Sequence, residues 1–174
     1  MIVYHGSKNQ FDQWSYNIIG QNGTSEGIGF YFTDNKTIAE GYASQGYLYT
    51  VEFNGKKLLS HDKKTITKQQ IKKYLLTLND KINYLDNYGE VEFEGLNSVL
   101  NEAIEAEYNS SDNDVDIVCG ICHASGNIET CLTTLHELLG YDSIVLPAEW
   151  GNGQTLYIAL VNNVIQIQKV ERID

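Results

Sequence analysis

The stretch Gly27–Ala43, GIGFYFTDNKTIAEGYA, carries the strongest local pattern of the chain. Its glycines lead into an aromatic, strand-like run, GFYFT, which ends at the polar pair Asp34 and Asn35. Either polar residue can cap a helix that runs to about Ser44, with Gly46 as its stop. The pattern predicts a strand followed at once by a short helix. Its aromatic rings suit a hydrophobic core as well as the walls of a pocket.

The segments around this stretch predict an α+β fold. Residues 1–5 and 47–53 have strand patterns. Residues 67–80, 96–108 and 127–140 have helical spacing. Three short β-rich segments follow them, in residues 142–149, 155–161 and 164–173. Because no repeat, linker or low-complexity tract interrupts them, we expect a single domain, residues 1–174, with a helical block over about residues 65–139.

The composition is that of a globular protein with unevenly placed charge. Apolar residues make up 42% of the 174 residues, and the net charge is −11. Seven lysines lie between Lys56 and Lys73, whereas residues 79–149 hold fifteen acids and one base, Lys81. The chain has a single arginine, Arg172. Since nucleic-acid binding needs cationic surface and phosphate recognition relies on arginine, this balance disfavours a nucleic-acid partner. The acidic surface suits a basic protein partner or serves solubility.

The sequence gives no sign of a membrane or of export. The first residues, MIVYHGSK, lack a basic segment followed by an apolar run, and no stretch approaches the roughly 18 apolar residues that span a bilayer. Three cysteines, odd in number and close together, argue against a disulfide framework. We therefore expect a soluble cytoplasmic protein, and the sequence implies no particular oligomeric state.

Cysteines and histidines cluster between residues 119 and 136. The run CGICH matches a haem-attachment pattern, but no export signal accompanies it and the only methionine is the first residue. A zinc set could be assembled from Cys119, Cys122, His123, Cys131 and His136, although their spacing fits no common zinc finger. We interpret these cysteines as core residues in or beside helices, and we expect no metal.

His5 ends the first predicted strand and is followed by Gly6 and Ser7. A lone histidine at a strand end is usually structural. Here Gly6 allows a ligand to approach the backbone, and Tyr31 and Tyr42 lie in a strand and a helix that could face His5. Together these residues form a candidate ligand pocket.

With these residues the chain resembles an ADP-ribosyltransferase of the His-Tyr-Glu class, the group that includes diphtheria toxin and the poly(ADP-ribose) polymerases. VYHGS resembles the family's first strand, and Gly27–Ala43 resembles its G-x-G-[IF]-Y-F-x-D segment and following helix. The step of eleven residues from Tyr31 to Tyr42 matches the polymerase spacing. The resemblance covers about the first 55 residues and, more thinly, the last strands. It extends to compact phage and bacterial members, including anti-CRISPR ADP-ribosyltransferases, which place a helical block before a turn like Leu139–Tyr141.

The resemblance implies a split β-sheet core and NAD⁺-dependent mono-ADP-ribosyl transfer to a protein side chain, with release of nicotinamide. It implies NAD⁺ as co-substrate, a target protein as acceptor, and an effector role in a phage or bacterium. By resemblance, the Gly6 backbone holds the nicotinamide carboxamide while Tyr31 and Tyr42 sandwich the ring. His5 would hydrogen-bond the adenosine ribose, and Ser7 would contact a ribose or the amide.

The family's acidic residue, which stabilises the positive charge that develops in the reaction, is where this chain departs from the pattern. Leu156 precedes YIAL, where the resemblance leads us to expect an acid. We favour Glu149 for this role, and the neutral Gln154 is the alternative. A catalytically weak or inactive NAD- or ADP-ribose-binding module that acts through protein–protein interaction remains a second reading. A third, the same fold acting on nucleic acid, is disfavoured by the single arginine.

Overall fold

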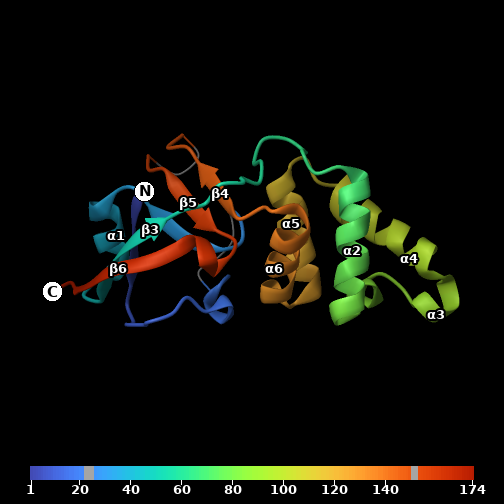
Figure 1. Ribbon diagram of the computed structural model, residues 1–174, viewed down its shortest axis with the longest axis horizontal. Helices are drawn as coiled ribbons and strands as arrows, with labels where there is room; N and C mark the ends of the chain where they lie inside the picture. The colour runs from blue at the N-terminus through green and yellow to red at the C-terminus, as the bar shows by residue number, and fades with distance from the viewer. Residues whose placement is uncertain (22–25, 150–152) are drawn as a thin grey trace. The chain divides into compact units, whose positions relative to one another are not determined.

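The computed structural model describes residues 1–21, 26–149 and 153–174, and these form two compact units (Figure 1). The sheet unit comprises Met1–Leu58 and Tyr141–Asp174, and the helical unit comprises Leu59–Gly140. The predicted α+β class is therefore confirmed. The helical unit encloses the predicted helical block, residues 65–139, whereas the one-domain organisation of residues 1–174 stays a prediction. None of the described helices is long and apolar enough to cross a lipid bilayer.

The sheet unit is built on six antiparallel strands in the order β4-β5-β2-β1-β3-β6. Their bounds are β1 (Ile2–Ser7), β2 (Phe30–Thr33), β3 (Tyr47–Phe53), β4 (Ser143–Leu146), β5 (Leu156–Ala159) and β6 (Ile165–Arg172). β1 pairs with β3 over six residue pairs and β2 with β5 over four, but β1 and β2 share only the pair Tyr4–Thr33. The sheet is thus split into two three-stranded halves, as predicted.

One face of the sheet carries an aromatic core. Side chains alternate between the two faces of a strand, so β2 directs Phe30 and Phe32 to the same face. They are 3% and 2% exposed, so these two rings belong to the core. The Trp14 ring, from the loop after β1, packs edge-on against both, with centroid distances of 5.7 and 5.0 Å. Phe53 of β3 extends this cluster to Phe32 at 6.2 Å.

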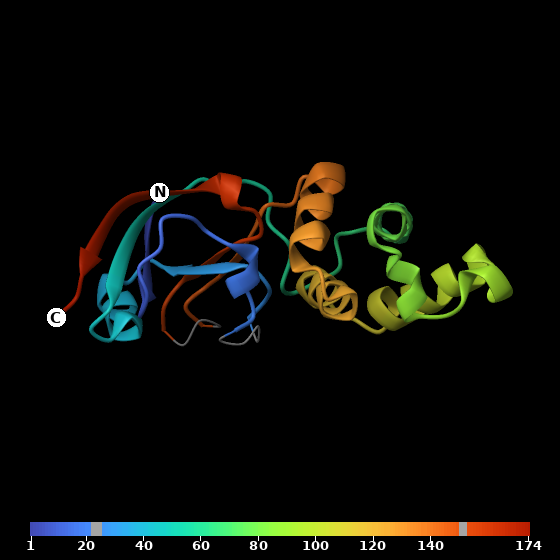
Figure 2. The ribbon, with the colours of Figure 1, turned by 90° about the horizontal axis from the view of Figure 1, so that it is seen from below.

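Helix α1 (Lys36–Ala43) follows β2 and lies against the opposite face (Figure 2). Of the two predicted caps, Asn35 is the one used, because its side chain accepts a hydrogen bond from the Ile38 backbone amide at 3.2 Å. The helix ends at Ser44, whose left-handed φ of 44° turns the chain toward β3.

The helical unit contains α2 (Lys68–Ile82), α3 (Val91–Glu94), α4 (Leu96–Ala103), α5 (Asp114–Ser125) and α6 (Ile128–Leu139). Thr67 caps α2 in a reciprocal capping box with Gln70. The predicted helices over residues 67–80, 96–108 and 127–140 are confirmed, the second as α4 followed by a π-helical turn over Ile104–Asn109. The sequence did not delimit α5, because the buried face of this helix includes the charged Asp114, which weakens the apolar pattern.

A buried carboxylate fixes the entrance to the helical unit. Asp114, fully buried at the start of α5, accepts hydrogen bonds from the backbone amides of Thr65 at 2.8 Å and Ile66 at 3.0 Å. The Thr65 hydroxyl donates to the same carboxylate. These bonds satisfy the charge inside the unit and hold the segment that leads into α2.

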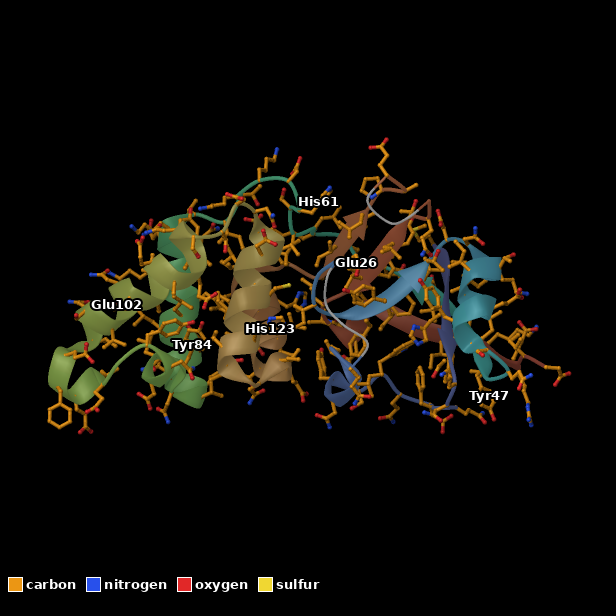
Figure 3. The ribbon with its side chains drawn as sticks, turned by 180° about the vertical axis from the view of Figure 1, so that it is seen from behind. Glu26, Tyr47, His61, Tyr84, Glu102 and His123 are labelled. Atoms are coloured by element: carbon orange, nitrogen blue, oxygen red, sulfur yellow. The ribbon has the colours of Figure 1, made fainter. Side chains whose placement is uncertain are left out.

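A second polar network ties the π-helical turn to its neighbours (Figure 3 labels Tyr84). The hydroxyls of Tyr84 and Tyr88 lie 2.7 Å apart, and the Tyr88 hydroxyl donates to Glu107 Oε1 at 2.5 Å. Burial raises the pKa of Tyr88, and its bond to Glu107 raises it further. Glu107 Oε2 occupies the space beside Gly120 of α5, where a Cβ atom would overlap it. A side chain at residue 120 would therefore have to move the Glu107 carboxylate.

Gly120→Ala should destabilise the protein, contrary to helix propensity. Inside a helix alanine is normally more stable than glycine by about 1 kcal/mol. Here the added methyl group displaces Glu107 from Tyr88, and a hydrogen bond to a charged group is worth about 1.5–3 kcal/mol. We expect a net loss of about 1 kcal/mol in the free energy of unfolding, measured by urea denaturation with far-UV circular dichroism.

The matched background for this test is Glu107→Ala, in which the clash no longer exists. There, Gly120→Ala should raise the free energy of unfolding by up to about 1 kcal/mol, so the sign of its effect reverses. Stabilisation by Gly120→Ala in both backgrounds would show that the Glu107 contact does not constrain this position.

Candidate active site

The split between β1 and β2 leaves two strand edges without strand partners in the described chain. Continued from Tyr4–Thr33, the antiparallel register would place Gly6 opposite Tyr31, but the ladder ends before that pair. Beyond Tyr4–Thr33, the contact between the two strands is made by a side chain, because the Tyr31 carbonyl bonds His5. All three β1 residues predicted for the site, His5, Gly6 and Ser7, lie on the part of β1 that pairs with β3 but not with β2.

His5 spans this split with its side chain. Its Nδ1 atom lies 2.8 Å from the carbonyl oxygen of Tyr31. The ring sits on the aromatic face of the sheet, edge-on to Trp14 at 5.1 Å and to Phe11 and Tyr49 at 6.0 Å each. Because a carbonyl oxygen can only accept, Nδ1 carries the proton and Nε2 is left as an acceptor. Burial lowers the pKa of His5, and the bond to Tyr31 opposes that shift in part, so the ring is neutral at pH 7.

Gly6 faces the other way, toward α1. A Cβ atom at this position would overlap the Ala39 carbonyl oxygen and lie 2.6 Å from the Ala43 amide nitrogen. The absence of a side chain thus allows α1 to pack its backbone onto β1. Ser7, the next residue, donates its hydroxyl proton to the Asn9 carbonyl at 2.8 Å and accepts from the Asn9 amide at 3.2 Å. This places Ser7 in a local turn at the end of β1.

The two predicted tyrosines lie on the elements that flank Gly6. Residues directly opposite in a ladder share a face, so Tyr4–Thr33 places Tyr31 on the face of Gly6 and α1. The Tyr31 hydroxyl donates to the carbonyl of Gly27, and this fixes a half-buried ring. Gly27 has a φ of 132°, which favours glycine there. Tyr42, on α1, is 64% exposed. The structure therefore groups Gly6, Tyr31 and the helix of Tyr42 on one face, and His5 on the other.

The two candidates for the acid differ in environment. Glu149 is exposed, three residues beyond the end of β4, and it borders residues 150–152, which lie outside the described chain. Gln154 is 7% exposed, and no described residue donates a hydrogen bond to its Oε1 atom. A buried carbonyl oxygen without a donor is costly and is a natural contact for a ligand hydroxyl. Leu156 begins β5 and pairs with Thr33, so it shares the face of Tyr31 and Gly6.

The aromatic cage of His5 was not found from the sequence. The Tyr49 hydroxyl bonds the amide of Phe11 at 2.6 Å and its carbonyl at 3.1 Å, which fixes the loop after β1 beside the histidine ring. Trp14 is 8% exposed, and its indole Nε1 has no acceptor within the described residues. The available signal was the aromatic pair in FDQWS, but only the folded loop shows that both rings meet His5.

Neither a surface hollow nor the cysteine-bearing helices contain any of the predicted site residues. A surface hollow of about 380 Å³ is lined by Asp12, Gln13, Trp14, Asn162, Ile165, Gln166 and Ile167, none of them predicted for the site. Within the described ranges, no group of three or more histidine, cysteine or acidic side chains is arranged to hold a metal ion. Cys122 and Cys131 are fully buried in the helical unit, in agreement with their interpretation as core residues.

Comparison with known proteins gives one match. The model of the family described as ADP-ribosyltransferase in polyvalent proteins matches residues 1–171, nearly the whole chain. No curated protein and no solved structure matches the chain.

The lowered pKa of His5 makes a prediction about stability. Below pH 6.5, its ordinary pKa, the unfolded chain binds a proton at this residue while the folded protein does not until its own lower pKa is reached. The free energy of unfolding should therefore decrease as the pH is lowered through this window, by at most about 1.4 kcal/mol per pH unit. The measurement is urea denaturation from pH 8 to pH 5.

His5→Gln is the control, since its amide can still donate to the Tyr31 carbonyl but does not titrate. The other histidines are common to both proteins, so their contributions cancel in the difference. That difference should be constant above about pH 7 and should change below it. Parallel profiles across the whole range would mean that His5 titrates normally in the folded protein.

Proposed function

This chain belongs to the ADP-ribosyltransferases in polyvalent proteins, and we propose that it transfers ADP-ribose from NAD⁺ to a protein side chain and releases nicotinamide. The predicted membership of the ADP-ribosyltransferase superfamily is confirmed, whereas the His-Tyr-Glu class and the likeness to anti-CRISPR members stay predictions. The observation that carries the proposal is the split sheet. The β1–β2 ladder ends after Tyr4–Thr33, and Gly6 and Tyr31 lie just beyond that pair on the face covered by α1.

The residues at the split suit the parts of NAD⁺. The backbone of Gly6, which lies beyond the last pair of β1 with β2, can offer the donor and acceptor that a carboxamide needs. Tyr31 provides a fixed aromatic ring, and the exposed Tyr42 provides a second ring from α1 that can close on a flat nicotinamide. The neutral His5 has Nε2 as an acceptor for a ribose hydroxyl. We assign these four residues to binding and orientation.

The reaction also needs a negative charge near the ribose. Cleavage of the bond between nicotinamide and ribose develops positive charge on the sugar, as in glycoside hydrolysis. Glu149 is the residue we propose for its stabilisation, carried on the loop between β4 and β5. The buried Oε1 of Gln154 can accept a hydrogen bond from a ribose hydroxyl and so position the sugar.

A second candidate function is a binding module that holds NAD⁺ or ADP-ribose without turnover. Leu156 favours it, because this apolar residue begins β5 on the face of Tyr31, where the resemblance leads us to expect an acid. For either function, the resemblance to compact phage and bacterial members supports an effector role in the cytoplasm of a bacterial cell.

Nicotinamide release is the direct test of the enzyme. The full chain should release nicotinamide from NAD⁺ and label a protein in a bacterial lysate with ADP-ribose. Tyr42→Ala should lower the rate at least about tenfold, because the loss of one stacking ring costs about 1.4 kcal/mol of binding. The matched control is Phe93→Ala, since Phe93 is 83% exposed in the helical unit, which contains none of the predicted site residues. Equal rates for the two variants would remove Tyr42 from the site.

Separate variants identify the acid. Glu149→Gln should retain NAD⁺ binding by calorimetry but lose about a hundredfold or more in turnover, the usual scale for a group that stabilises developing charge. Gln154→Ala should mainly weaken NAD⁺ binding. The reverse pattern would assign the role to residue 154, and Gln154→Glu would then raise turnover. Binding of NAD⁺ by the unmodified chain without any nicotinamide release would establish the binding module.

A further inference from the structure

The helical unit exposes two large apolar side chains beyond the edge of its own core. On α4, Val99 and Leu100 are buried, whereas Leu96, one turn earlier on the same side of the helix, is 43% exposed. Phe93, three residues before Leu96, is 83% exposed. Gly95, with a φ of 85°, separates α3 from α4, so Phe93 and Leu96 are exposed apolar residues of two consecutive helices. Exposed large apolar side chains that lie close together in this way are candidates for covering by a partner.

Carboxylates lie close to Phe93 in the sequence. Glu90 precedes α3, and Glu92 and Glu94 lie on it. Glu102, labelled in Figure 3, lies on α4. All four are exposed, and no described lysine or arginine forms a salt bridge with them. We call Phe93, Leu96 and these four glutamates the acidic corner. It combines an unpartnered aromatic ring with uncompensated negative charge.

We propose that the acidic corner docks a cationic amphipathic segment of another protein. The apolar side of such a segment would cover Phe93 and Leu96, and its lysines or arginines would meet the four carboxylates. Charge complementarity selects this partner. Nucleic acids and anionic lipid surfaces would be repelled, and a second copy of this chain brings its own net charge of −11. This inference goes beyond the proposed reaction and does not depend on it.

The binding experiment uses the full chain and a fluorescent synthetic helix with leucines on one side and lysines on the other. A peptide of the same composition, scrambled so that it has no apolar side, is the control ligand. By fluorescence anisotropy the amphipathic peptide should bind at least about tenfold more tightly than the scrambled one. Phe93→Ser should weaken that binding at least about tenfold, and it can be made without loss of packing because the ring is exposed.

A charge-matched pair of variants separates docking from general attraction. Glu90, Glu92 and Glu94 changed together to glutamine should also weaken binding at least about tenfold. Asp80, Asp112 and Glu129, exposed acids elsewhere in the helical unit, remove the same charge when changed to their amides and should alter binding less than about twofold.

Three outcomes would overturn the proposal: equal losses in the two triple variants, normal binding by Phe93→Ser, or a dimer of the unmodified chain that Phe93→Ser dissolves in sedimentation. The last would assign the acidic corner to a second copy of the chain. Nicotinamide release by Phe93→Ser should equal that of the unmodified protein. A failure of peptide binding would therefore not contradict the proposed transferase activity. An absence of nicotinamide release would not contradict the docking proposal.

Discussion

The hydrogen bond from His5 to the Tyr31 carbonyl spans the place where the sheet divides. β1 and β2 share one residue pair. Beyond that pair, the His5 side chain, and not a backbone hydrogen bond of the ladder, connects the two strands. The bond requires a neutral ring with its proton on Nδ1. That state is favoured because Trp14 and the neighbouring rings exclude water from the histidine. The bond that joins β1 to β2 at the split therefore depends on how the aromatic face packs.

Gly6 allows α1 to pack closely against the opposite face of the same strand. One residue along β1, a missing side chain lets the backbone of α1 approach at a distance that alanine would forbid. His5 thus positions β2, and Gly6 positions α1. Both residues have a packing role before any ligand is considered, so the His-Gly pair by itself is weak support for catalysis. The stronger support lies in a group that packing leaves without a donor among the described residues, the buried Oε1 of Gln154.

The sequence predicted those features that depend on neighbouring residues, such as helix caps. It did not predict features that depend on contacts with distant parts of the chain. Asn35 and Thr67 cap the helices that begin beside them, and such caps can be recognised from sequence. The buried face of α5 includes the charged Asp114, whose burial depends on partners in the segment before α2, so the apolar pattern alone did not delimit this helix. The pairing of Tyr4 with Thr33 decides that Tyr31 faces Gly6 while His5 does not, and a register cannot be read from one strand. Likewise, the cage of His5 is completed by Trp14, which comes from a loop.

Eighty-two residues, Leu59–Gly140, are inserted between β3 and β4. The sheet unit only has to bring the two ends of this insertion close together. Leu58 and Ser143 form a parallel bridge, so the chain leaves and re-enters this unit at adjacent points. Asp142 holds these points together, because its carboxylate accepts from the amides of Lys56 at 2.9 Å and Lys57 at 3.1 Å. These contacts are internal to the sheet unit, as the bonds of Asp114 are internal to the helical unit. Since each unit satisfies its own buried carboxylate at the junction, the surface of the inserted helices can vary without a change at the split between β1 and β2. A partner-binding role for the helices and a chemical role for the sheet are therefore compatible within one chain.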